Sequence, residues 1–405
     1  MFGKLTLEKM HTHSSAVIVR VDFNVPLDKK GAILDDNRIA KTLPTIRWLL
    51  ERKNRLILLS HLGDPEKVDS FYSLHKCATR LEELLQIKVH FISDPFQKST
   101  TQFLHNLPFP SVTLIENLRF WEEEKAPFLR PSFAKELASL GDFYINEAFS
   151  ASHRPHASII QLPTWFPQKA AMGFLFAEEL QMLHPLLSHP PAPFSVILGG
   201  AKVFSKIKLL HNLLKHADNF FIAGSMAATF LKSLHLSIGS STYEENLMGK
   251  AQQFLQEAQN LGKAVYLPLD YKAARLSKDK EWVDIKNFTT VSGLNKEYHG
   301  LDIGAATLTR WKEILEHSQT IFWNGPLGMF ENPEFAQSTY GLAQFLAESC
   351  SRKSKKIILG GGDLHAALQS LQIQKGVFQE STGGGASLAY LEQGSLPGLH
   401  ALSNE

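Results

Sequence analysis

The sequence predicts an α/β protein of two lobes, each built on a mostly parallel β-sheet with helices on both faces. The chain has 405 residues, and at roughly 150 residues per domain this length favours two domains of ordinary size. Short apolar runs alternate with longer helical stretches in both halves, which is typical of parallel strands that are covered on both faces. Hydrophobic residues make up 44% of the chain and charged residues 20%, so each lobe has enough apolar material for a core.

The expected strands are short runs rich in leucine and β-branched residues. They cover residues 17–21, 56–59, 112–115 and 143–145 in the first half, and 196–198, 220–222, 264–267, 321–323 and 357–359 in the second. Between the halves, residues 174–187 have helical spacing and are followed by a turn-rich stretch. We therefore predict an N-terminal lobe over residues 1–173, an interdomain helix and hinge over 174–193, and a C-terminal lobe over 194–392.

Charge and cysteine content exclude several classes of protein. Lysine plus arginine number 42 against 40 acidic residues, which is too balanced for a binder of nucleic acid or of an anionic membrane. Cys77 and Cys350 lie far apart, so neither a disulfide framework nor a zinc knuckle is expected. No apolar run approaches the ~18 residues of a membrane span, and residues 1–15 lack the apolar core of a signal peptide. We expect a cytoplasmic protein, and a monomer, because no long amphipathic stretch lacks an intramolecular partner.

Polar and cationic residues follow the predicted strands of the first half. An arginine fork binds carboxylate or phosphate oxygens in pairs, so Arg38, Arg119 and Arg154 around one crevice would hold a small, highly anionic molecule. Asp22 and Asn24 would orient its hydroxyl groups. The alternative for any one of these residues is a solvated loop position, but four polar strand ends in one half favour a site.

Glycine-rich turns follow the predicted strands of the second half, at residues 199–202, 224–226, 360–363 and 383–385. Glycines let the backbone approach a ligand closely, and helix N-termini present free N–H groups to phosphates. Lys202 and Lys206 are one helical turn apart just after the first of these turns. A single glycine pair is more often a tight turn, but the repeated pattern predicts a site for a nucleoside triphosphate.

Two carboxylates complete this predicted nucleotide site. Glu331 follows a strand where a ribose would be held, and Asp363 follows three glycines. Asp363 is the candidate Mg²⁺ ligand, because Mg²⁺ is usually held by one or two carboxylates together with substrate phosphates; its alternative role is to cap a helix. Neither the P-loop motif nor the dinucleotide-binding glycine fingerprint is present.

In their order along the chain, these segments resemble the phosphoglycerate kinase family. The resemblance runs from residues 19–26 (VRVDFNVP) to residues 381–387 (STGGGAS) and the closing Leu-Pro-Gly at 396–398. It implies two Rossmann-like lobes, of which the first binds 3-phosphoglycerate or 1,3-bisphosphoglycerate and the second binds MgADP or MgATP. It also implies that the tail, residues 393–405, packs back on the N-terminal lobe.

The resemblance also assigns site residues, position by position. The acid substrate would be bound by Asp22, Phe23, Asn24, Arg38, His61, Leu62, Gly63, Asp64, Arg119 and Arg154. The nucleotide would be bound by Gly199, Lys202, Lys206, Gly300, Glu331, Gly361, Gly362, Asp363 and Leu364, with Mg²⁺ on Asp363 directly or through water. Arg38 and Lys202 would be the catalytic residues, because they would neutralise the phosphoryl group in transfer.

The chain departs from the family pattern at several positions. Asp64 stands where the family usually has arginine, so one favourable charge near the acid substrate is reversed. The other departures are at Glu147, Ser150, Ala223, Ser225, Leu364 and His365. These departures affect the expected affinities more than the reaction, since the arginines and lysines for transfer remain.

The implied reaction is the reversible transfer of the acyl phosphate of 1,3-bisphosphoglycerate to MgADP, which gives 3-phosphoglycerate and MgATP in glycolysis. Positioning and charge neutralisation dominate such a transfer, and no catalytic base is needed. There are two alternative functions. Glycine-rich turns in an α/β fold also suit an NAD-dependent dehydrogenase, but the dinucleotide-binding fingerprint is absent from this sequence. Asp64 and Leu364 suggest the second alternative, a non-catalytic protein on a kinase scaffold.

Overall fold

The computed structural model describes residues 3–200, 204–352, 354–374 and 376–405. The chain divides into two compact units: the first is Met1–Gln181 together with Ser395–Glu405, and the second is Met182–Gly394. The division falls within helix α7 (Phe174–Leu183). In the described parts of the chain, no helix is long and apolar enough to cross a membrane.

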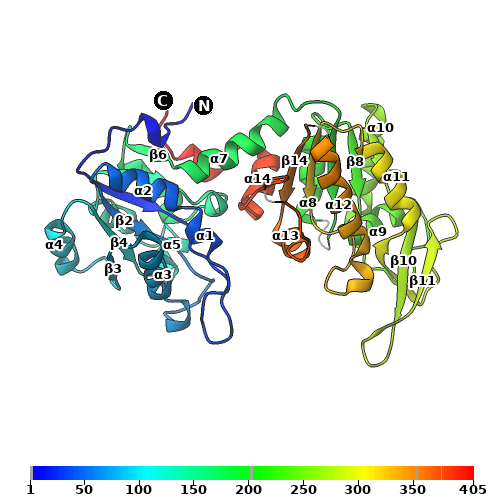
Figure 1. Ribbon diagram of the computed structural model, residues 1–405, viewed down its shortest axis with the longest axis horizontal. Coiled ribbons are helices and arrows are strands. Elements are labelled where there is room, and N and C mark those ends of the chain that lie inside the picture. Colours follow the sequence, from blue (N-terminus) through cyan, green and yellow to red (C-terminus); the bar gives the residue numbers. More distant parts are fainter. Residues whose placement is uncertain (1–2, 201–203, 353, 375) are drawn as a thin grey trace. The chain divides into compact units, whose positions relative to one another are not determined.

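The first unit is built on six parallel strands in the order β3-β4-β2-β1-β5-β6 (Figure 1). They are β1 (Ala16–Arg20), β2 (Arg55–Leu59), β3 (Val89–Ile92), β4 (Ser111–Ile115), β5 (Phe143–Asn146) and β6 (Ala170–Met172). β1, β2, β4 and β5 confirm the predicted strands. The sheet-edge strands β3 and β6 were not predicted. The two middle residues of β3 are only partly buried and include a histidine, and β6 is Ala-Ala-Met without a β-branched residue, so neither gives a clear apolar strand signal.

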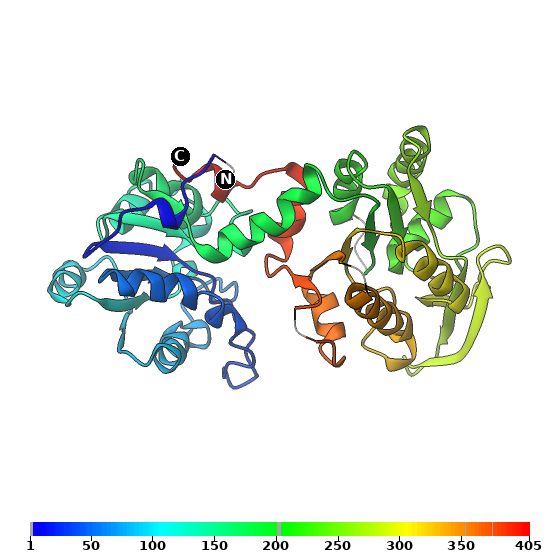
Figure 2. The ribbon, with the colours of Figure 1, turned by 45° about the horizontal axis from the view of Figure 1, so that its top comes forward.

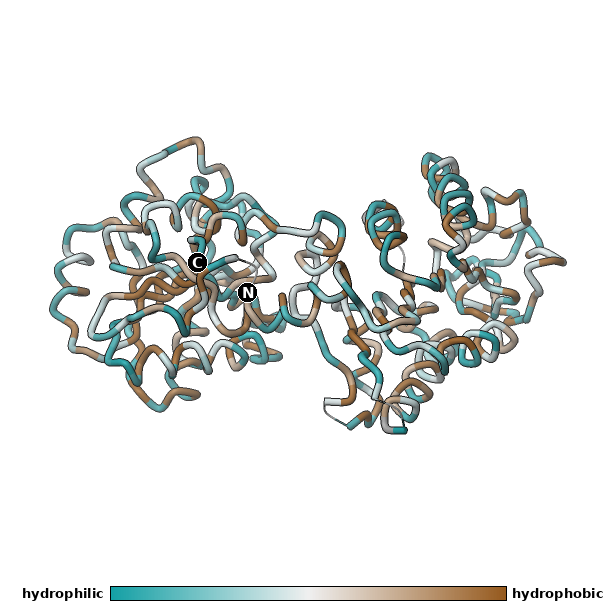
Figure 3. The backbone as a smooth tube through the Cα atoms, turned by 90° about the horizontal axis from the view of Figure 1, so that it is seen from above, coloured by the Kyte–Doolittle hydropathy of each residue, from teal (hydrophilic) through white to brown (hydrophobic). Residues whose placement is uncertain are grey.

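Helices cover both faces of this sheet. They are α1 (Asn37–Ala40), α2 (Leu43–Glu51), α3 (His75–Leu85), α4 (Lys98–Asn106), α5 (Glu122–Lys125) and α6 (Ser132–Ala138), with α7 and the short α15 (Pro397–His400). Successive strand side chains point to opposite faces: Val17 and Val19 pack with Ile46 of α2 and Leu81 of α3, while Ile18 between them is also fully buried. Figure 3 shows these apolar strands at the centre of the unit.

The second unit contains another sheet of six parallel strands, in the order β15-β14-β13-β7-β8-β9. They are β7 (Phe194–Leu198), β8 (Asn219–Ile222), β9 (Ala264–Tyr266), β13 (Thr320–Asn324), β14 (Lys356–Gly360) and β15 (Gln379–Glu380). All except β15, which has only two residues, were predicted. The fold class expected from the sequence is therefore confirmed in both halves.

Helices cover both faces of this second sheet as well. They are α8 (Phe204–Leu213), α9 (Gly224–Ser233), α10 (Met248–Asn260), α11 (Ala305–Leu315), α12 (Gln337–Arg352), α13 (Gly362–Leu368) and α14 (Gly385–Gln393). On one face, Trp323 of β13 shares a core with Trp311 of α11 and Leu346 of α12. On the other, Phe220 of β8 packs against Phe254 of α10 with ring centroids 5.4 Å apart.

A smaller antiparallel sheet in the second unit was not predicted. It consists of β10 (Asp270–Leu276), β11 (Trp282–Thr289) and β12 (Tyr298–Ile303) in the order β11-β10-β12. Most residues of β11 are exposed, so this strand lacks the continuous apolar run that identified the others. The sheet contributes one end of the cavity described below.

The end of the chain belongs to the first unit, where it runs beside the N-terminal segment (Figures 1 and 2). Lys4 and Asn404 form an antiparallel bridge. The Lys4 ammonium group donates to the carbonyl oxygens of His400 and Leu402 at 3.0 and 2.7 Å. Hydrogen bonds between residues almost 400 positions apart thus anchor both chain ends in one folded unit.

Candidate functional site

Polar segments follow β1, β2, β4 and β5 at one edge of the first sheet. These strands are parallel neighbours in the order β4-β2-β1-β5, so their carboxyl ends lie side by side. The predicted acid-binding residues that follow them are Asp22, Phe23, Asn24, His61, Leu62, Gly63, Asp64, Arg119 and Arg154. Arg38 reaches the same edge from α1. We call this set of residues the cationic edge.

Asp22 follows β1 and orients Arg38. Arg38 Nη1 and the Ser150 hydroxyl both donate to Asp22 Oδ2. Burial opposes ionisation of Asp22, but the neighbouring His61 and Arg38 lower its pKa to about 2. Burial also lowers the pKa of His61 well below its ordinary value, so Arg38 carries the positive charge beside Asp22 at neutral pH. The ion pair with Asp22 fixes the direction of the Arg38 side chain. This side chain is 35% exposed and therefore remains accessible to a ligand.

Backbone groups of the cationic edge are also held in place. The Phe23 N–H donates to the Ser60 hydroxyl, and the Gly63 N–H donates to Asn24 Oδ1, both at 2.8 Å. The side chains of Phe23 and Leu62 are buried in the core. These two predicted residues therefore offer only their backbone at the edge, while Asn24 links the ends of two neighbouring strands.

Arg119 follows β4 and is only 5% exposed. Its Nη1 donates to the carbonyl oxygen of Gly63, while its buried Nε has no hydrogen-bond partner among the described residues. Gly63 has a φ of +63°, and a Cβ there would lie 2.4 Å from the ring of Tyr72, so the turn that receives Arg119 requires glycine. The Arg119 guanidinium is therefore held by this turn and keeps one donor that no described residue uses.

Asp64 lies between two cations. Its Oδ1 is 3.3 Å from Lys125 Nζ and 3.7 Å from Arg119 Nη1, and its side chain is 62% exposed. Burial alone would raise its pKa, but Arg119 and Lys125 lower it. The carboxylate is therefore charged at neutral pH and offsets part of the positive charge of the cationic edge.

Arg154 is exposed in the largely buried segment after β5, between His153 and His156. Each histidine has a buried Nδ1 without a hydrogen-bond partner in the described part of the chain. Burial and nearby arginines lower the pKa of His153, and they lower the pKa of His156 to about 3. Neither histidine was predicted as a site residue, although their positions beside Arg154 were a signal in the sequence.

Arg20, at the end of β1, has a structural role. It is fully buried, its Nε donates to the Ser158 hydroxyl at 2.8 Å, and its Nη2 lies 3.6 Å from Glu124 Oε1. The same Nη2 is 3.3 Å from His61 Nδ1. Arg20 therefore fixes His61 beside Asp22. The sequence did not reveal this network, because its members come from four separate segments.

Glu147, one of the departures from the family pattern, follows β5 and is 1% exposed. Its Oε1 accepts the N–H of Leu175, near the start of α7, at 3.2 Å. Its Oε2 has no hydrogen-bond partner among the described residues. Burial raises the pKa of this carboxyl to about 7, so Glu147 titrates near neutral pH.

Glu147→Gln is expected to remove a pH dependence of stability. The unfolded carboxyl has a pKa near 4.5, so between that value and about 7 the folded chain keeps a proton that the unfolded chain loses. The free energy of unfolding of the wild type should fall as pH rises through this window, by on the order of 3 kcal/mol. The glutamine variant should not show that loss.

Urea unfolding of the full chain at several pH values across this window measures the effect. Glu51→Gln is the matched control, because Glu51 is an exposed carboxylate at the end of α2 in the same unit. A difference between the wild type and Glu147→Gln that does not change with pH would contradict the prediction.

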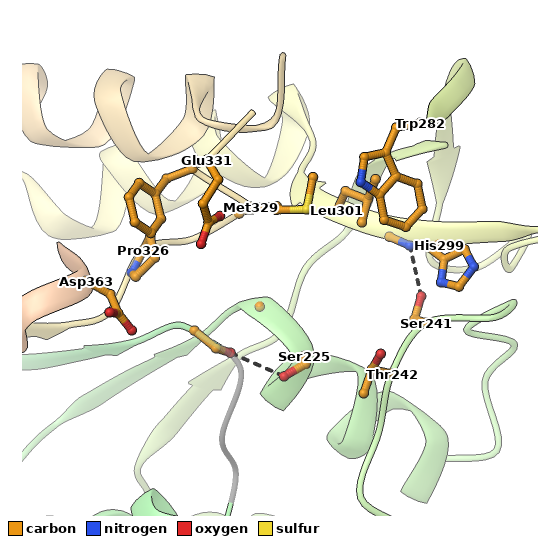
Figure 4. Close-up of a pocket in the computed structure, with 15 residues that line it drawn as sticks. Ser225, Ser241, Thr242, Trp282, His299, Leu301, Pro326, Met329, Glu331 and Asp363 are labelled. Atoms are coloured by element: carbon orange, nitrogen blue, oxygen red, sulfur yellow. Dashed lines mark hydrogen bonds between the residues drawn. The ribbon is translucent and has the colours of Figure 1, made fainter. Parts of the chain in front are cut away.

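A cavity of about 340 Å³ lies in the second unit (Figure 4). The predicted nucleotide residues Gly300, Glu331 and Asp363 line it. Asp363 lies at one end and Trp282 at the other, with Glu331 between them. The cavity thus has a glycine and carboxylate end and an aromatic end.

Backbone turns that pack closely against each other form the glycine end. A Cβ on Gly199 would lie 2.0 Å from the Pro326 carbonyl oxygen, and a Cβ on Gly224, whose φ is +62°, would lie 2.5 Å from the Gly200 carbonyl oxygen. Only glycine allows these approaches. Gly200, Gly224 and Pro326 therefore line this end of the cavity with backbone, as a phosphate-binding turn requires.

Lys206, on α8, lies against these turns. It is 8% exposed, and its Nζ donates to the Gly199 carbonyl oxygen at 2.6 Å. Burial lowers its pKa to about 8, against the opposing effect of Asp363. The predicted Lys202 lies outside the described residues.

The turn after β14 places Gly361 directly before α13 and Gly362 at the first position of that helix. Gly361 has a φ of +95°, and a Cβ there would lie 2.8 Å from Asn324 Nδ2, whereas Gly362 faces open space. Leu364 is fully buried in the core of the unit. Its side chain is therefore separate from the cavity, and only its backbone is available to a nucleotide.

Asp363 is the residue of the cavity that fits Mg²⁺. Its side chain is exposed in the first turn of α13 and lines the cavity. No group of three or more His, Cys, Asp or Glu side chains forms a metal site within the described ranges. Mg²⁺ usually keeps waters and binds one or two carboxylates together with substrate phosphates, so a single carboxylate beside a glycine turn is a suitable donor set.

Trp282, His299, Ser241 and Thr242 also line the cavity, and none was predicted. They come from the antiparallel sheet and from the segment after α9. Their only signal in the sequence was an isolated aromatic residue in a polar stretch, which does not distinguish a ligand contact from a surface position.

Two parallel α/β units, one with a cationic edge and the other with a glycine-lined cavity, define a kinase that acts on a small anionic substrate. The family model described as phosphoglycerate kinase matches residues 7–394. The chain belongs to the phosphoglycerate kinase family. Its reaction is the phosphoryl transfer between the carboxyl group of 3-phosphoglycerate and ATP, a step of glycolysis.

Relatives and solved structures agree with this assignment. The chain is 43% identical over 404 residues to a phosphoglycerate kinase of Chlamydia muridarum, covering 99% of this chain and 98% of that relative. It is similar to the structure of phosphoglycerate kinase from Coxiella burnetii, with a TM-score of 0.85 and 33% identity over 98% of both chains. The structure from Pyrococcus horikoshii matches with a TM-score of 0.83 and 30% identity, again over 98% of both.

Proposed function

We propose that the first unit binds 3-phosphoglycerate or 1,3-bisphosphoglycerate and that the second binds MgADP or MgATP. The observation that supports this division is a set of buried nitrogen atoms in the first unit, Arg119 Nε and the Nδ1 atoms of His153 and His156, that have no hydrogen-bond partner among the described residues. They lie in a different unit from the glycine-lined cavity.

A coupled assay of ATP formation from 1,3-bisphosphoglycerate and ADP, with each ligand omitted in turn, tests this function. Protection against unfolding by MgADP but not by NAD separates it from a dehydrogenase. A well-folded chain that forms no ATP would overturn the proposal and favour a non-catalytic scaffold.

In the first unit, the arginines carry the recognition. Arg38, Arg119 and Arg154 bind the carboxylate and phosphate oxygens, and Asp22 holds the Arg38 fork in the direction of the ligand. The remaining proposed acid-substrate residues, some acting through the backbone, are Phe23, Asn24, His61, Leu62, Gly63 and Asp64. His153 and His156 join them as neutral imidazoles.

In the second unit, backbone turns and lysines carry the recognition. Arg38 and Lys202 are the proposed catalytic residues, because charge spreads over the oxygens of the moving phosphoryl group and these two cations neutralise it. The other proposed nucleotide residues are Gly199, Lys206, Gly300, Glu331, Gly361, Gly362, Asp363 and Leu364. Glu331 accepts hydrogen bonds from the ribose hydroxyls, which its place in the middle of the cavity allows.

Asp363 is the proposed Mg²⁺ ligand, directly or through water. Asp363 would hold the ion, and Mg²⁺ bound with the nucleotide would supply neutralisation of the phosphate charge. The contribution of this chain is one carboxylate at the phosphate end of the cavity. The buried Lys206 is close enough to Asp363 for their charges to interact.

Asp64→Arg is expected to lower the KM for 3-phosphoglycerate and to leave the KM for ATP unchanged. The change removes a negative charge next to Arg119 and adds a donor for the anionic ligand. Because the Asp64 side chain is 62% exposed, the gain is limited to about 0.5–1 kcal/mol, or roughly two- to fivefold in KM. Asp64→Asn, which only removes the negative charge, should lie between the two. Steady-state kinetics measure this, and equal values for all three proteins would contradict it.

The two units must come together for transfer, because each ligand is proposed to bind a different one. Reacting atoms must be about 3–3.5 Å apart, and water must be excluded from the acyl phosphate. Small-angle scattering should show the radius of gyration falling only when 3-phosphoglycerate and a MgATP analogue are both present. Full compaction with one ligand alone would disprove the two-ligand requirement.

We further propose that the protein acts as a monomer, since one chain supplies residues for both ligands, and that it acts in the cytoplasm, where a glycolytic reaction has its substrates. Size-exclusion chromatography with light scattering tests the first statement. A mass of two chains at assay concentrations would overturn it.

A further inference from the structure

Ser150 is the middle residue of a short 3-10 turn, Phe149–Ala151, that follows β5. Its neighbours Phe149 and Ala151 are buried in the first unit. The turn is closed by a backbone hydrogen bond in which the Ser152 N–H donates to the Phe149 carbonyl oxygen at 2.9 Å. Because the residues on both sides are anchored in the core, the half-buried Ser150 side chain leaves the turn in a fixed direction.

The Ser150 hydroxyl takes part in the ion pair between Asp22 and Arg38. The hydroxyl and Arg38 Nη1 donate to the same carboxylate oxygen, Asp22 Oδ2. Arg38 Nη1 also lies 3.5 Å from the Ser150 oxygen. These three groups form a closed triangle, which connects the segments after β1 and β5 with α1.

Asp22 needs such support because it is a buried carboxylate. It is 7% exposed, and a buried charge is costly unless its hydrogen-bonding positions are filled. Its Oδ1 accepts the Asn24 N–H at 3.0 Å, and its Oδ2 accepts the Ser150 hydroxyl. Burial opposes the ionisation of Asp22, but its neighbours, Ser150 among them, lower its pKa to about 2. The hydroxyl stabilises the carboxylate without adding charge, so Arg38 keeps its positive charge for a ligand.

We propose that Ser150 is a positioning residue for the phosphoryl transfer. Its hydroxyl holds the Asp22 carboxylate, and this carboxylate holds the Arg38 fork in the direction of the moving phosphoryl group. This inference rests on the proposed catalytic role of Arg38. Since Ser150 is one of the departures from the family pattern, its hydroxyl refines the site of this chain, and its removal should cost only part of the activity.

Removal of the hydroxyl should appear in turnover. Ser150→Ala should lower kcat by roughly three- to thirtyfold, which is less than the loss expected for Arg38→Ala. The KM for ATP should stay unchanged, because the nucleotide is proposed to bind the other unit. Ser150→Thr keeps the hydroxyl and should recover most of the turnover. Ser139→Ala is the matched control, because Ser139 is an exposed residue of the first unit whose hydroxyl donates only within its own turn, to the Glu136 carbonyl oxygen.

A double-mutant cycle separates positioning from a general structural effect. If Ser150 acts through Arg38, its hydroxyl has nothing left to position once that side chain is removed. In an Arg38→Ala background, Ser150→Ala should therefore change kcat by less than about twofold. A residue that only supports the fold would lower turnover by the same factor in both backgrounds.

The mobility of the Arg38 guanidinium gives an independent measurement. In protein with ¹⁵N-labelled arginine, the Nε signal of Arg38 is assigned by its loss in Arg38→Lys. Relaxation of this signal should show an ordered side chain in the wild type and a more mobile one in Ser150→Ala. The signal of Arg130, an ion-paired arginine outside the cationic edge, should be the same in both proteins.

Two results would overturn the inference. One is a kcat of Ser150→Ala within about twofold of the wild type, and the other is an equal loss in the wild-type and Arg38→Ala backgrounds. If the alanine variant fails to fold, Ser150→Gly, which also lacks the hydroxyl, replaces it in both measurements. A turnover that falls in Arg38→Ala but not in Ser150→Ala refutes only this inference, whereas full turnover in Arg38→Ala refutes the proposed role of Arg38 as well.

Discussion

Arg38→Ala should lower turnover by about 10²- to 10³-fold, or roughly 3–4 kcal/mol, as the loss of one preorganised transition-state donor does in other enzymes. The expected loss appears in kcat, because charge spreads over the phosphoryl oxygens during transfer. The geometry supports preorganisation, since Asp22 holds the Arg38 fork while 35% of the side chain remains exposed.

Steady-state kinetics with both substrates varied measure this effect. Arg130→Ala is the matched control: Arg130 is also ion-paired in the first unit and is 38% exposed, but it lies outside the cationic edge. Arg38→Lys should recover only part of the activity, because an ammonium group lacks the planar fork. An increase in KM with unchanged turnover would show that Arg38 serves ground-state binding alone. Lys202→Ala should behave like Arg38→Ala.

Asp363→Asn should weaken the binding of MgADP by about ten- to a hundredfold, which is the range of a charge-assisted interaction of roughly 1.5–3 kcal/mol. Metal-free ADP should lose much less, because only the magnesium complex needs the carboxylate. The amide has nearly the same size, so the variant tests charge with little change in shape.

Calorimetric titration with and without Mg²⁺ distinguishes the two ligands. Glu380→Gln is a suitable control, because Glu380 is an exposed carboxylate of the second unit that pairs with His365 outside the described lining of the cavity. Equal losses of MgADP and ADP affinity in Asp363→Asn would refute the metal role and indicate a direct effect on the turn.

The parallel sheets could be predicted because their strands are buried on both faces. Residues 321–323 form the middle of β13, where every residue is buried, so the signal is a continuous apolar run within the strand itself. The outer strand β11 has no such run, since most of its residues face solvent and its pairing with β10 is interrupted by a bulge. The position of β11 is set by its pairing with β10, and this pairing cannot be inferred from the local sequence.

The candidate site was likewise predictable only in part. The types and order of its polar residues were visible in the sequence, because parallel strands bring the residues that follow them to one edge. The partners of these residues were not visible. Asp64 pairs with Lys125, which is 61 positions away, and the core takes up the side chains of Phe23 and Leu364, although both were predicted to bind ligands.

The sequence by itself determined the two α/β halves, the cationic strand ends of one half and the glycine turns of the other, since each of these depends on a few neighbouring residues. The tertiary structure decided which groups meet: Arg20 with His61, Glu147 with the start of α7, and Trp282 with the far end of the cavity. The burial of a side chain, its pKa and its unused hydrogen-bonding atoms all depend on the residues that pack around it. That environment comes from strand order and helix packing, which join residues far apart in the chain.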